Sequence, residues 1–234
     1  MNDIKKTVGI MGGMGPMATA DLIYNIVSQT AAQKDSDHVH LLIDSDGSVP
    51  DRTAAILHGK ESPLAHLCTM AKKLEYMGAD IIAISCNTSH YFYEQICEAV
   101  NVPVINMIDE TARSVARSGA KKVLLLATDG TVKMGLYDKY FSRYGIETAY
   151  MTEEGQREVM KLIYDCVKAG HYEFDTELFC RHLREAGAED MPVVLGCTEL
   201  PIAFKHFGID EFCTVDPSKI LASAIITRAG AKLK

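Results

Sequence analysis

Ile81-Ile82-Ala83-Ile84-Ser85-Cys86-Asn87-Thr88 is an apolar run that ends in a cysteine and polar residues. Val193-Val194-Leu195-Gly196-Cys197-Thr198 repeats this pattern in the second half of the chain. Neither run alternates between apolar and polar residues, which is typical of strands in a parallel sheet covered by helices on both faces. Ligands of such sheets bind beyond the carboxyl ends of the strands. The pattern therefore predicts an α/β fold with a cysteine at each of two ligand-binding edges.

Further short runs rich in β-branched residues predict more strands, at residues 8–10, 41–43, 102–105 and 123–126. Helical periodicity separates them, at residues 19–32, 64–77, 110–117, 133–144, 154–168 and 178–186. Glycines stand just past five of the predicted helix ends, where a left-handed residue commonly closes a helix. The alternation of strand and helix predicts parallel sheets.

The two halves of the chain also resemble each other. Lys6-Thr7-Val8-Gly9-Ile10 is followed by glycines, and Lys122-Val123-Leu124-Leu125-Leu126 is followed by Asp129-Gly130-Thr131. We therefore expect two similar α/β halves, residues 1–107 and residues 108–209. The segment 210–234, with a helix from about residue 217 to 232, is expected to pack back on the first half.

Composition excludes several classes of partner. The formal net charge is −7 and tryptophan is absent, so neither a basic surface for nucleic acid nor a base-stacking platform is expected. Seven cysteines without a CxxC pair indicate reduced thiols. No apolar run has the length of a membrane-spanning helix. Lys5 and Lys6 precede an apolar stretch, as in a secretion signal. Glycines and Pro16 would break the helix that such a signal forms, so we expect a cytoplasmic protein.

Cys86 and Cys197 are the candidate chemical groups. A strand end that opens into a helix offers unpaired N–H groups and a positive dipole end, and both favour the reactive thiolate. Either cysteine alone could simply fill space, but their matched positions favour a shared function. The other five are expected to be structural: Cys68, Cys97, Cys166, Cys180 and Cys213.

The loop Gly12-Gly13-Met14-Gly15-Pro16-Met17-Ala18 allows two interpretations. From Gly13 it fits the dinucleotide fingerprint, with Asp44 placed for a ribose. Pro16 has no N–H to offer a pyrophosphate. We therefore favour the second interpretation, in which the glycines let the loop backbone approach a small ligand closely.

Two cations are candidate binding groups. Arg52 lies in a polar loop that we expect to be exposed, where it would bind a carboxylate or remain a solvated charge. Lys168 ends a predicted helix, a position that favours cations without any further function. His90 follows Cys86 closely and would tune it or bond a local partner. Histidine spacing gives no metal pattern, so no metal is expected.

These motifs together resemble the aspartate/glutamate racemase family, its aspartate racemase branch most of all. The resemblance rests on residues 12–16, 50–53, 86–90 and 196–199, in the family's order, and it covers nearly the whole chain. It implies two Rossmann-like halves related by a pseudo-twofold axis, a homodimer, and no pyridoxal phosphate or other cofactor. It also implies Cys86 and Cys197 as paired acid and base thiols that face each other across one cleft.

The same resemblance implies the substrate-binding residues Met14, Arg52, Asn87, Thr88, Thr128, Thr131, Lys168 and Thr198. Both cations are present, which favours an acidic amino acid such as aspartate, with glutamate as another possible substrate. Three alternatives remain open: a related cysteine-based decarboxylase or isomerase, a dinucleotide-dependent dehydrogenase that rests on the glycine loop alone, and a small-molecule binding protein without activity.

Overall fold

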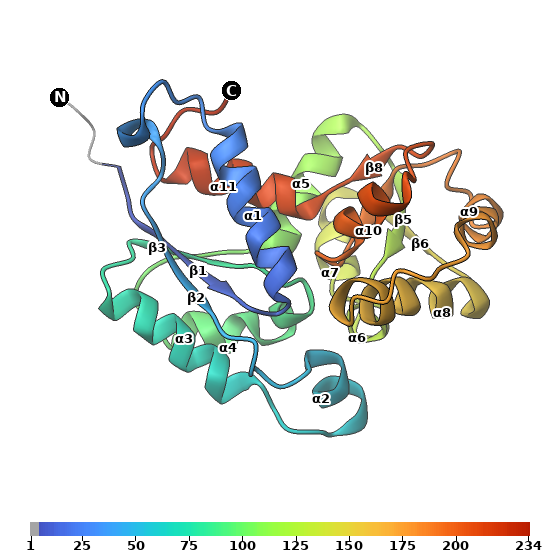
Figure 1. Cartoon of the computed structure of the whole chain (residues 1–234), viewed down its shortest axis with the longest axis horizontal. Helices are drawn as coiled ribbons and strands as arrows, with labels where there is room; N and C mark the ends of the chain where they lie inside the picture. The colour runs from blue at the N-terminus through green and yellow to red at the C-terminus, as the bar shows by residue number, and fades with distance from the viewer. Residues whose placement is uncertain (1–4) are drawn as a thin grey trace. The chain divides into compact units, whose positions relative to one another are not determined.

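The computed structural model describes residues 5–234, which group into two units. The first unit contains the chain up to Met107 together with Ser218–Lys234, and the second contains Ile108–Pro217. Figure 1 shows both units, each with a sheet flanked by helices.

The sheet of the first unit has the strand order β2-β1-β3-β4, and all its strand pairs are parallel. The strands are β1 (Val8–Gly12), β2 (Leu41–Ser45), β3 (Ile81–Ile84) and β4 (Val104–Ile105). Every residue of β1 and β3 is buried. Full burial explains why these strands are apolar at consecutive positions.

Two layers of helices cover this sheet. On one face, α1 (Pro16–Gln29) and α11 (Pro217–Arg228) bury Leu22, Ile26, Leu221 and Ile225 against β1 and β3. On the other face lie α3 (Leu64–Tyr76) and α4 (Tyr93–Glu98). The remaining helices are the short segments α2 (Arg52–His58), η1 (Asp35–Asp37) and η2 (Thr88–Phe92). The last helix of the chain thus completes the core of the first unit.

The second unit repeats this plan with the parallel order β6-β5-β7-β8. Its strands are β5 (Lys122–Leu126), β6 (Glu147–Tyr150), β7 (Val193–Leu195) and β8 (Thr214–Val215). One face packs on α8 (Glu153–Lys161), the π-helix η4 (Leu162–Lys168), α9 (Thr176–Glu185) and α10 (Leu200–Phe207). The other packs on α5 (Met107–Ser118) and α7 (Asp138–Phe141). The short segments α6 (Asp129–Lys133) and η3 (Ser142–Tyr144) complete the unit.

The predicted α/β fold with two similar parallel sheets is confirmed. In both sheets the first strand of the unit lies second in the order, and the third strand of the unit follows it. β3 and β7 are therefore equivalent, and Cys86 and Cys197 lie two residues beyond the last residue of each.

Two details differ from the sequence-based expectations. Residues 210–217 group with the second unit, because Thr214 and Val215 in β8 pair with β7. The expected helix at residues 133–144 is broken into α6, α7 and η3, with Gly135 in the left-handed region at φ 57°. Within residues 5–234, no helix has both the length and the apolar character needed to cross a bilayer.

Candidate functional site

Cys86 lies just beyond β3 and is 5% exposed. Asn87 and Thr88 follow it at the start of η2, and both side chains are buried. The equivalent sequence in the second unit places Cys197 after β7, with 6% exposure. Each unit thus supplies one nearly buried thiol at the carboxyl end of its third strand.

His90 holds the backbone around Cys86. The Met107 N–H donates to His90 Nε2 at 3.0 Å, so Nδ1 carries the ring proton and donates to the Cys86 carbonyl at 2.9 Å. Burial lowers the pKa of His90 from 6.5 to about 4. The ring is therefore neutral at pH 7, and it bonds the Cys86 carbonyl. Of the two roles considered for His90, the local partner is the one that the hydrogen bonds support.

The glycine loop between β1 and α1 packs against its own unit. A Cβ on Gly12 would meet the Thr19 side chain, and a Cβ on Gly13, whose φ is 85°, would lie 2.4 Å from the Asp46 backbone. The Gly13 N–H donates to Thr19 Oγ1 at 2.8 Å, so this amide is engaged within the loop. The dinucleotide interpretation needs free amides here, and this bond weighs against it.

Arg52 is buried, at 7% exposure, so the expectation of an exposed side chain is wrong. The residue begins α2, whose N-cap Asp51 accepts a hydrogen bond from the Ala54 N–H. Nη1 donates to the carbonyls of Val49 and Pro50 at 3.3 and 3.2 Å, and Nη2 donates to the Met14 carbonyl at 3.1 Å. The guanidinium therefore ties the loop before α2 to the glycine loop.

Met14 is buried at 2% exposure, and its sulfur accepts a hydrogen bond from Ser89 Oγ at 3.4 Å. The structure thus connects Met14 to Arg52 through its backbone and to the loop after Cys86 through its side chain. Three motifs that are far apart in the sequence meet at one edge of the first sheet.

Gly196 places Cys197 in the second unit. A Cβ at Gly196 would lie 2.7 Å from Leu125 Cδ1 and 3.1 Å from the Leu126 carbonyl oxygen, so no larger residue fits without movement. The Gly196 N–H donates to that same carbonyl at 2.7 Å. The cysteine therefore follows a strand end that is tightly packed against β5.

Cys197 has a carboxylate partner that sequence reasoning missed. The thiol donates to Glu199 Oε2 at 2.9 Å, and Thr198 Oγ1 donates to the same oxygen at 3.3 Å. Burial raises the pKa of the Cys197 thiol well above its ordinary value. The negative charge of Glu199 raises this pKa further, while the Lys168 ammonium lowers it. Glu199 was visible in the motif after Cys197, but its sequence position alone does not show where its side chain lies.

Thr128 and Thr131 form the cap of α6. The Thr128 hydroxyl accepts a hydrogen bond from the Thr131 N–H at 3.4 Å, and the two hydroxyl oxygens are 3.1 Å apart. Both residues are buried. Gln156 Nε2 binds the residues on both sides of Thr128, because it donates to the Ala127 carbonyl at 3.0 Å and to Asp129 Oδ1 at 2.8 Å. Gln156 is a second supporting residue that no sequence motif indicated.

Lys168 ends the π-helix η4, and its ammonium lies 4.5 Å from the centre of the Tyr164 ring. π-helical segments are rare and recur at functional sites. Since Lys168 also acts on the Cys197 thiol, the structure brings Lys168 and Cys197 into one electrostatic environment.

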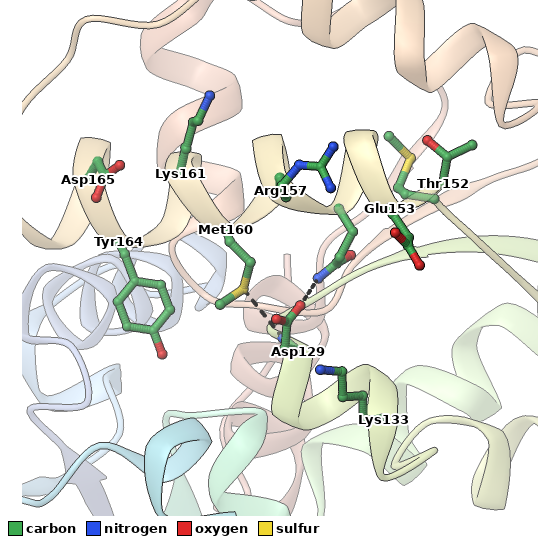
Figure 2. Close-up of a pocket in the computed structure, with 11 residues that line it drawn as sticks. Asp129, Lys133, Thr152, Glu153, Arg157, Met160, Lys161, Tyr164 and Asp165 are labelled. Atoms are coloured by element: carbon green, nitrogen blue, oxygen red, sulfur yellow. Dashed lines mark hydrogen bonds between the residues drawn. The ribbon is translucent and has the colours of Figure 1, made fainter. Parts of the chain in front are cut away.

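A cavity of about 750 Å³ lies on the second unit, lined by α6, α8 and η4 (Figure 2). Dashed lines in Figure 2 mark the bonds of Asp129 to the Met160 sulfur and to Gln156. Two cations of its lining, Arg157 and Lys161, are paired with Glu154 and Glu158. The lining contains none of the predicted site residues.

Across residues 5–234, no group of three or more His, Cys, Asp or Glu side chains is arranged to hold a metal ion.

The fold and the site define a class of α/β proteins with two equivalent parallel sheets, each followed by a nearly buried cysteine just beyond its third strand. The chain belongs to the Asp/Glu/Hydantoin racemase family, which it matches over residues 11–225. Membership in this family supports amino-acid racemase activity, an isomerase reaction.

Three similar proteins illustrate the range of the family. The aspartate racemase of Picrophilus torridus is 35% identical, with a TM-score of 0.83 over 98% of this chain and 96% of that one. The broad specificity amino-acid racemase RacX of Bacillus subtilis (strain 168) is 28% identical over 94% of this chain and 96% of its own length. A glutamate racemase of Lysinibacillus sphaericus (strain C3-41) is 30% identical over 70% of this chain and 60% of its own length.

Proposed function

We propose that the protein interconverts L- and D-aspartate, with Cys86 and Cys197 as the two acid/base groups and without pyridoxal phosphate. The observation that carries this proposal is the equivalence of β3 and β7, each of which leads into a nearly buried cysteine. Each cysteine is followed within two residues by a threonine, Thr88 or Thr198.

The chemistry explains why two equivalent thiols are useful. Racemisation removes the α-proton from one face of the carbon and delivers a proton to the opposite face. A thiolate takes the α-proton and becomes a thiol, and the C–H electron pair remains on the α-carbon. The second thiol then donates its proton to that carbon and becomes a thiolate. The reverse reaction uses the same two groups with their roles exchanged.

The carbanion-like intermediate needs stabilisation, because an α-proton is far less acidic than a thiol. Hydrogen-bond donors near a carboxylate supply such stabilisation. We assign this function to Asn87 and Thr88 in the first unit and to Thr128, Thr131 and Thr198 in the second. Met14 shapes the first-unit side of the site through its contact with Ser89.

The choice of an acidic substrate rests on Arg52 and Lys168. Arg52 is a fixed positive charge held by three carbonyls, and Lys168 is a second cation near Cys197. Similarity to the Picrophilus torridus aspartate racemase supports aspartate. Glutamate and a broader set of amino acids are the alternatives, in line with the other two relatives.

Deuterium exchange tests the activity directly. The purified protein, without added cofactor, is incubated in heavy water with L-aspartate, D-aspartate, glutamate or alanine. We expect deuterium at the α-carbon and inversion of both aspartate isomers, with slower reaction of alanine. Inversion only after addition of pyridoxal phosphate, or no inversion of any amino acid, would contradict the proposal.

The two-thiol assignment is tested with Cys86→Ala and Cys197→Ala. Each variant lacks the acid or base for one face, so each is expected to lose racemisation by a factor of at least about 1,000. Cys213→Ala is the matched control, since Cys213 is exposed and lies outside the site. Racemisation by either Cys86→Ala or Cys197→Ala at the rate of the control would disprove the assignment.

A further inference from the structure

His90 is a buried imidazole whose two nitrogens bind two separate segments of the backbone. Nδ1 donates to the Cys86 carbonyl at 2.9 Å, and Nε2 accepts from the Met107 N–H at 3.0 Å. The side chain is buried, and both of these partners are main-chain atoms. One neutral ring therefore connects the peptide that follows the candidate thiol to a second, distant point of the chain.

Met107 is a fixed point of the first unit. Its side chain is fully buried in the core cluster that contains β1 and α11. It is also the first residue of α5, and the chain passes into the second unit immediately after it. The first N–H groups of a helix have no acceptor within that helix. His90 Nε2 supplies an acceptor for the N–H of Met107, so the ring is anchored to the start of α5.

Tyr93 holds the imidazole from its face. The two rings are stacked, with their centres 5.9 Å apart and their planes at 6°. The Tyr93 hydroxyl in turn donates to the Val104 carbonyl of β4 at 2.8 Å. β4 pairs with β3, the strand that leads into Cys86. The ring is thus fixed by the sheet and by α5, and the loop after β3 is attached to the ring.

We propose that His90 is a positioning residue for Cys86, a role that rests on the function proposed above. The bond from Nδ1 fixes the orientation of the peptide between Cys86 and Asn87, and with it the direction in which the thiol leaves the backbone. Proton transfer tolerates little displacement, since an error of about 1 Å costs about 100-fold in rate. The ring itself stays neutral and passes no proton.

The second unit holds its cysteine in another way. Four residues after Cys197 the chain has Pro201, whose side chain has no hydrogen-bonding group, where the first unit has His90. Cys197 instead follows Gly196, which packs tightly against β5. Loss of the His90 bond should therefore affect Cys86 and leave Cys197 unchanged, so the second thiol serves as an internal reference.

Two amide variants separate the two bonds of the ring. The amide of asparagine reaches the position of Nδ1, so His90→Asn keeps a donor for the Cys86 carbonyl. The amide of glutamine reaches the position of Nε2, so His90→Gln keeps only an acceptor for the Met107 N–H. We expect kcat for aspartate to fall about 10- to 100-fold in His90→Gln. In His90→Asn it should stay within about threefold of the wild type.

Thiol alkylation gives a measurement that does not depend on activity. The rates at Cys86 and Cys197 are followed with iodoacetamide at one fixed pH by peptide mass spectrometry. In His90→Gln we expect Cys86, now 5% exposed, to react several-fold faster because its loop is released, while Cys197 reacts as before. His90→Asn should match the wild type at both thiols. A general loss of stability would change both rates together.

Thr30→Val is the matched control for lost stability. It removes a buried side-chain bond to the Ile26 carbonyl, elsewhere in the first unit. We expect this variant to keep the wild-type kcat and the wild-type ratio of the two alkylation rates. Equal alkylation of Cys86 in the wild type and His90→Gln, or equal kcat in His90→Gln and His90→Asn, would overturn the inference.

The two proposals fail in different ways. If Cys86→Ala racemises aspartate at the wild-type rate, the proposed function is wrong, whatever His90 does. If Cys86→Ala is inactive but His90→Gln has the wild-type kcat, only the role of His90 is wrong. Should His90→Gln not fold, long-range ¹H–¹⁵N spectra of the wild type decide: a ring proton on Nε2 instead of Nδ1 would contradict the bond to Cys86.

Discussion

Arg52 shows how a single residue can serve both stability and a candidate site. Its guanidinium donates to three carbonyl oxygens from two loops, and the side chain is buried. Removing it would leave these acceptors without their donor in a place that water reaches poorly, and each such loss costs about 1–3 kcal/mol.

We therefore predict that Arg52→Ala lowers the free energy of unfolding by about 3 kcal/mol and raises KM for aspartate. Urea unfolding followed by circular dichroism measures the first effect, and steady-state kinetics measures the second. Arg117→Ala is the control, since Arg117 is an exposed arginine at the end of α5. Equal stability of the two variants would show that the three hydrogen bonds do not stabilise the fold.

His90 gives a prediction about pH. Its pKa is 6.5 in the unfolded chain and about 4 in the folded protein, so the unfolded state binds a proton first as the pH falls. The contribution of neutral His90 to the free energy of unfolding is therefore fully present above about pH 6.5. It is lost as the pH falls from there to about 4, by about 3 kcal/mol in total.

The measurement is the free energy of unfolding at pH 7.0 and pH 4.5, in the wild type and in His90→Gln. The variant is expected to be less stable at pH 7.0 and to lose less stability on acidification than the wild type. A parallel loss in both proteins would assign the acid sensitivity to other groups.

For single residues, the sequence indicated which side chains are candidates for the site, but it did not predict the burial or the hydrogen-bond partners of those side chains. Cys86 and Cys197 stood out because each follows an apolar strand, and the structure does place both at strand ends. The burial of Arg52 could not be foreseen, because residues 50–53 look polar and give no sign that their carbonyls fold back onto a guanidinium. The Cys197–Glu199 contact depends on a side-chain torsion, which periodicity does not report.

At the scale of elements, Gly196 allows the end of β7 to pack closely against β5. A side chain there meets Leu125, the Leu126 carbonyl and the ring of Tyr137, all of which are buried. We predict that Gly196→Ala destabilises the protein by about 1–3 kcal/mol and reduces racemisation, because the strand end that carries Cys197 must move.

Thermal unfolding and kinetics check this prediction. Gly47→Ala is the control, since a Cβ at Gly47 would lie 3.9 Å from Pro16 Cγ, an ordinary contact. If Gly196→Ala matched Gly47→Ala in both stability and rate, close packing at Gly196 would not position the cysteine.

Several elements could be predicted from sequence and others could not. β3 and β7 have the expected bounds because full burial leaves an unmistakable apolar run. β6 was not predicted, because its residues Glu147–Tyr150 are half-exposed and exposed and carry no apolar run. The helix expected at residues 133–144 failed at Gly135, whose left-handed backbone ends one helix before α7 begins. Periodicity counts apolar positions and does not detect such a break.

At the scale of the whole molecule, the two ends of the chain meet in one core. Leu221 and Ile225 of α11 are fully buried in the cluster that contains Val8 and Ile10 of β1. The second unit is thus inserted between two segments of the first. Completion of the first unit requires the last helix of the chain.

Ile225→Ala should therefore destabilise the first unit by about 3 kcal/mol, because it leaves a cavity in a fully packed core. Urea unfolding measures the loss, and Thr227→Ala, on the exposed side of the same helix, is the control. If both variants had the stability of the wild type, α11 would not be an energetically important part of that core.

The uneven exposure of the seven thiols has a practical consequence. Cys86 and Cys197 are nearly buried, whereas Cys213 is exposed just before β8. A bulky maleimide dye at neutral pH should therefore attach to Cys213 well before it reaches the two candidate catalytic thiols. The chain carries a native attachment point for a fluorophore, in a protein without tryptophan, so that ligand binding could be followed optically without an introduced cysteine.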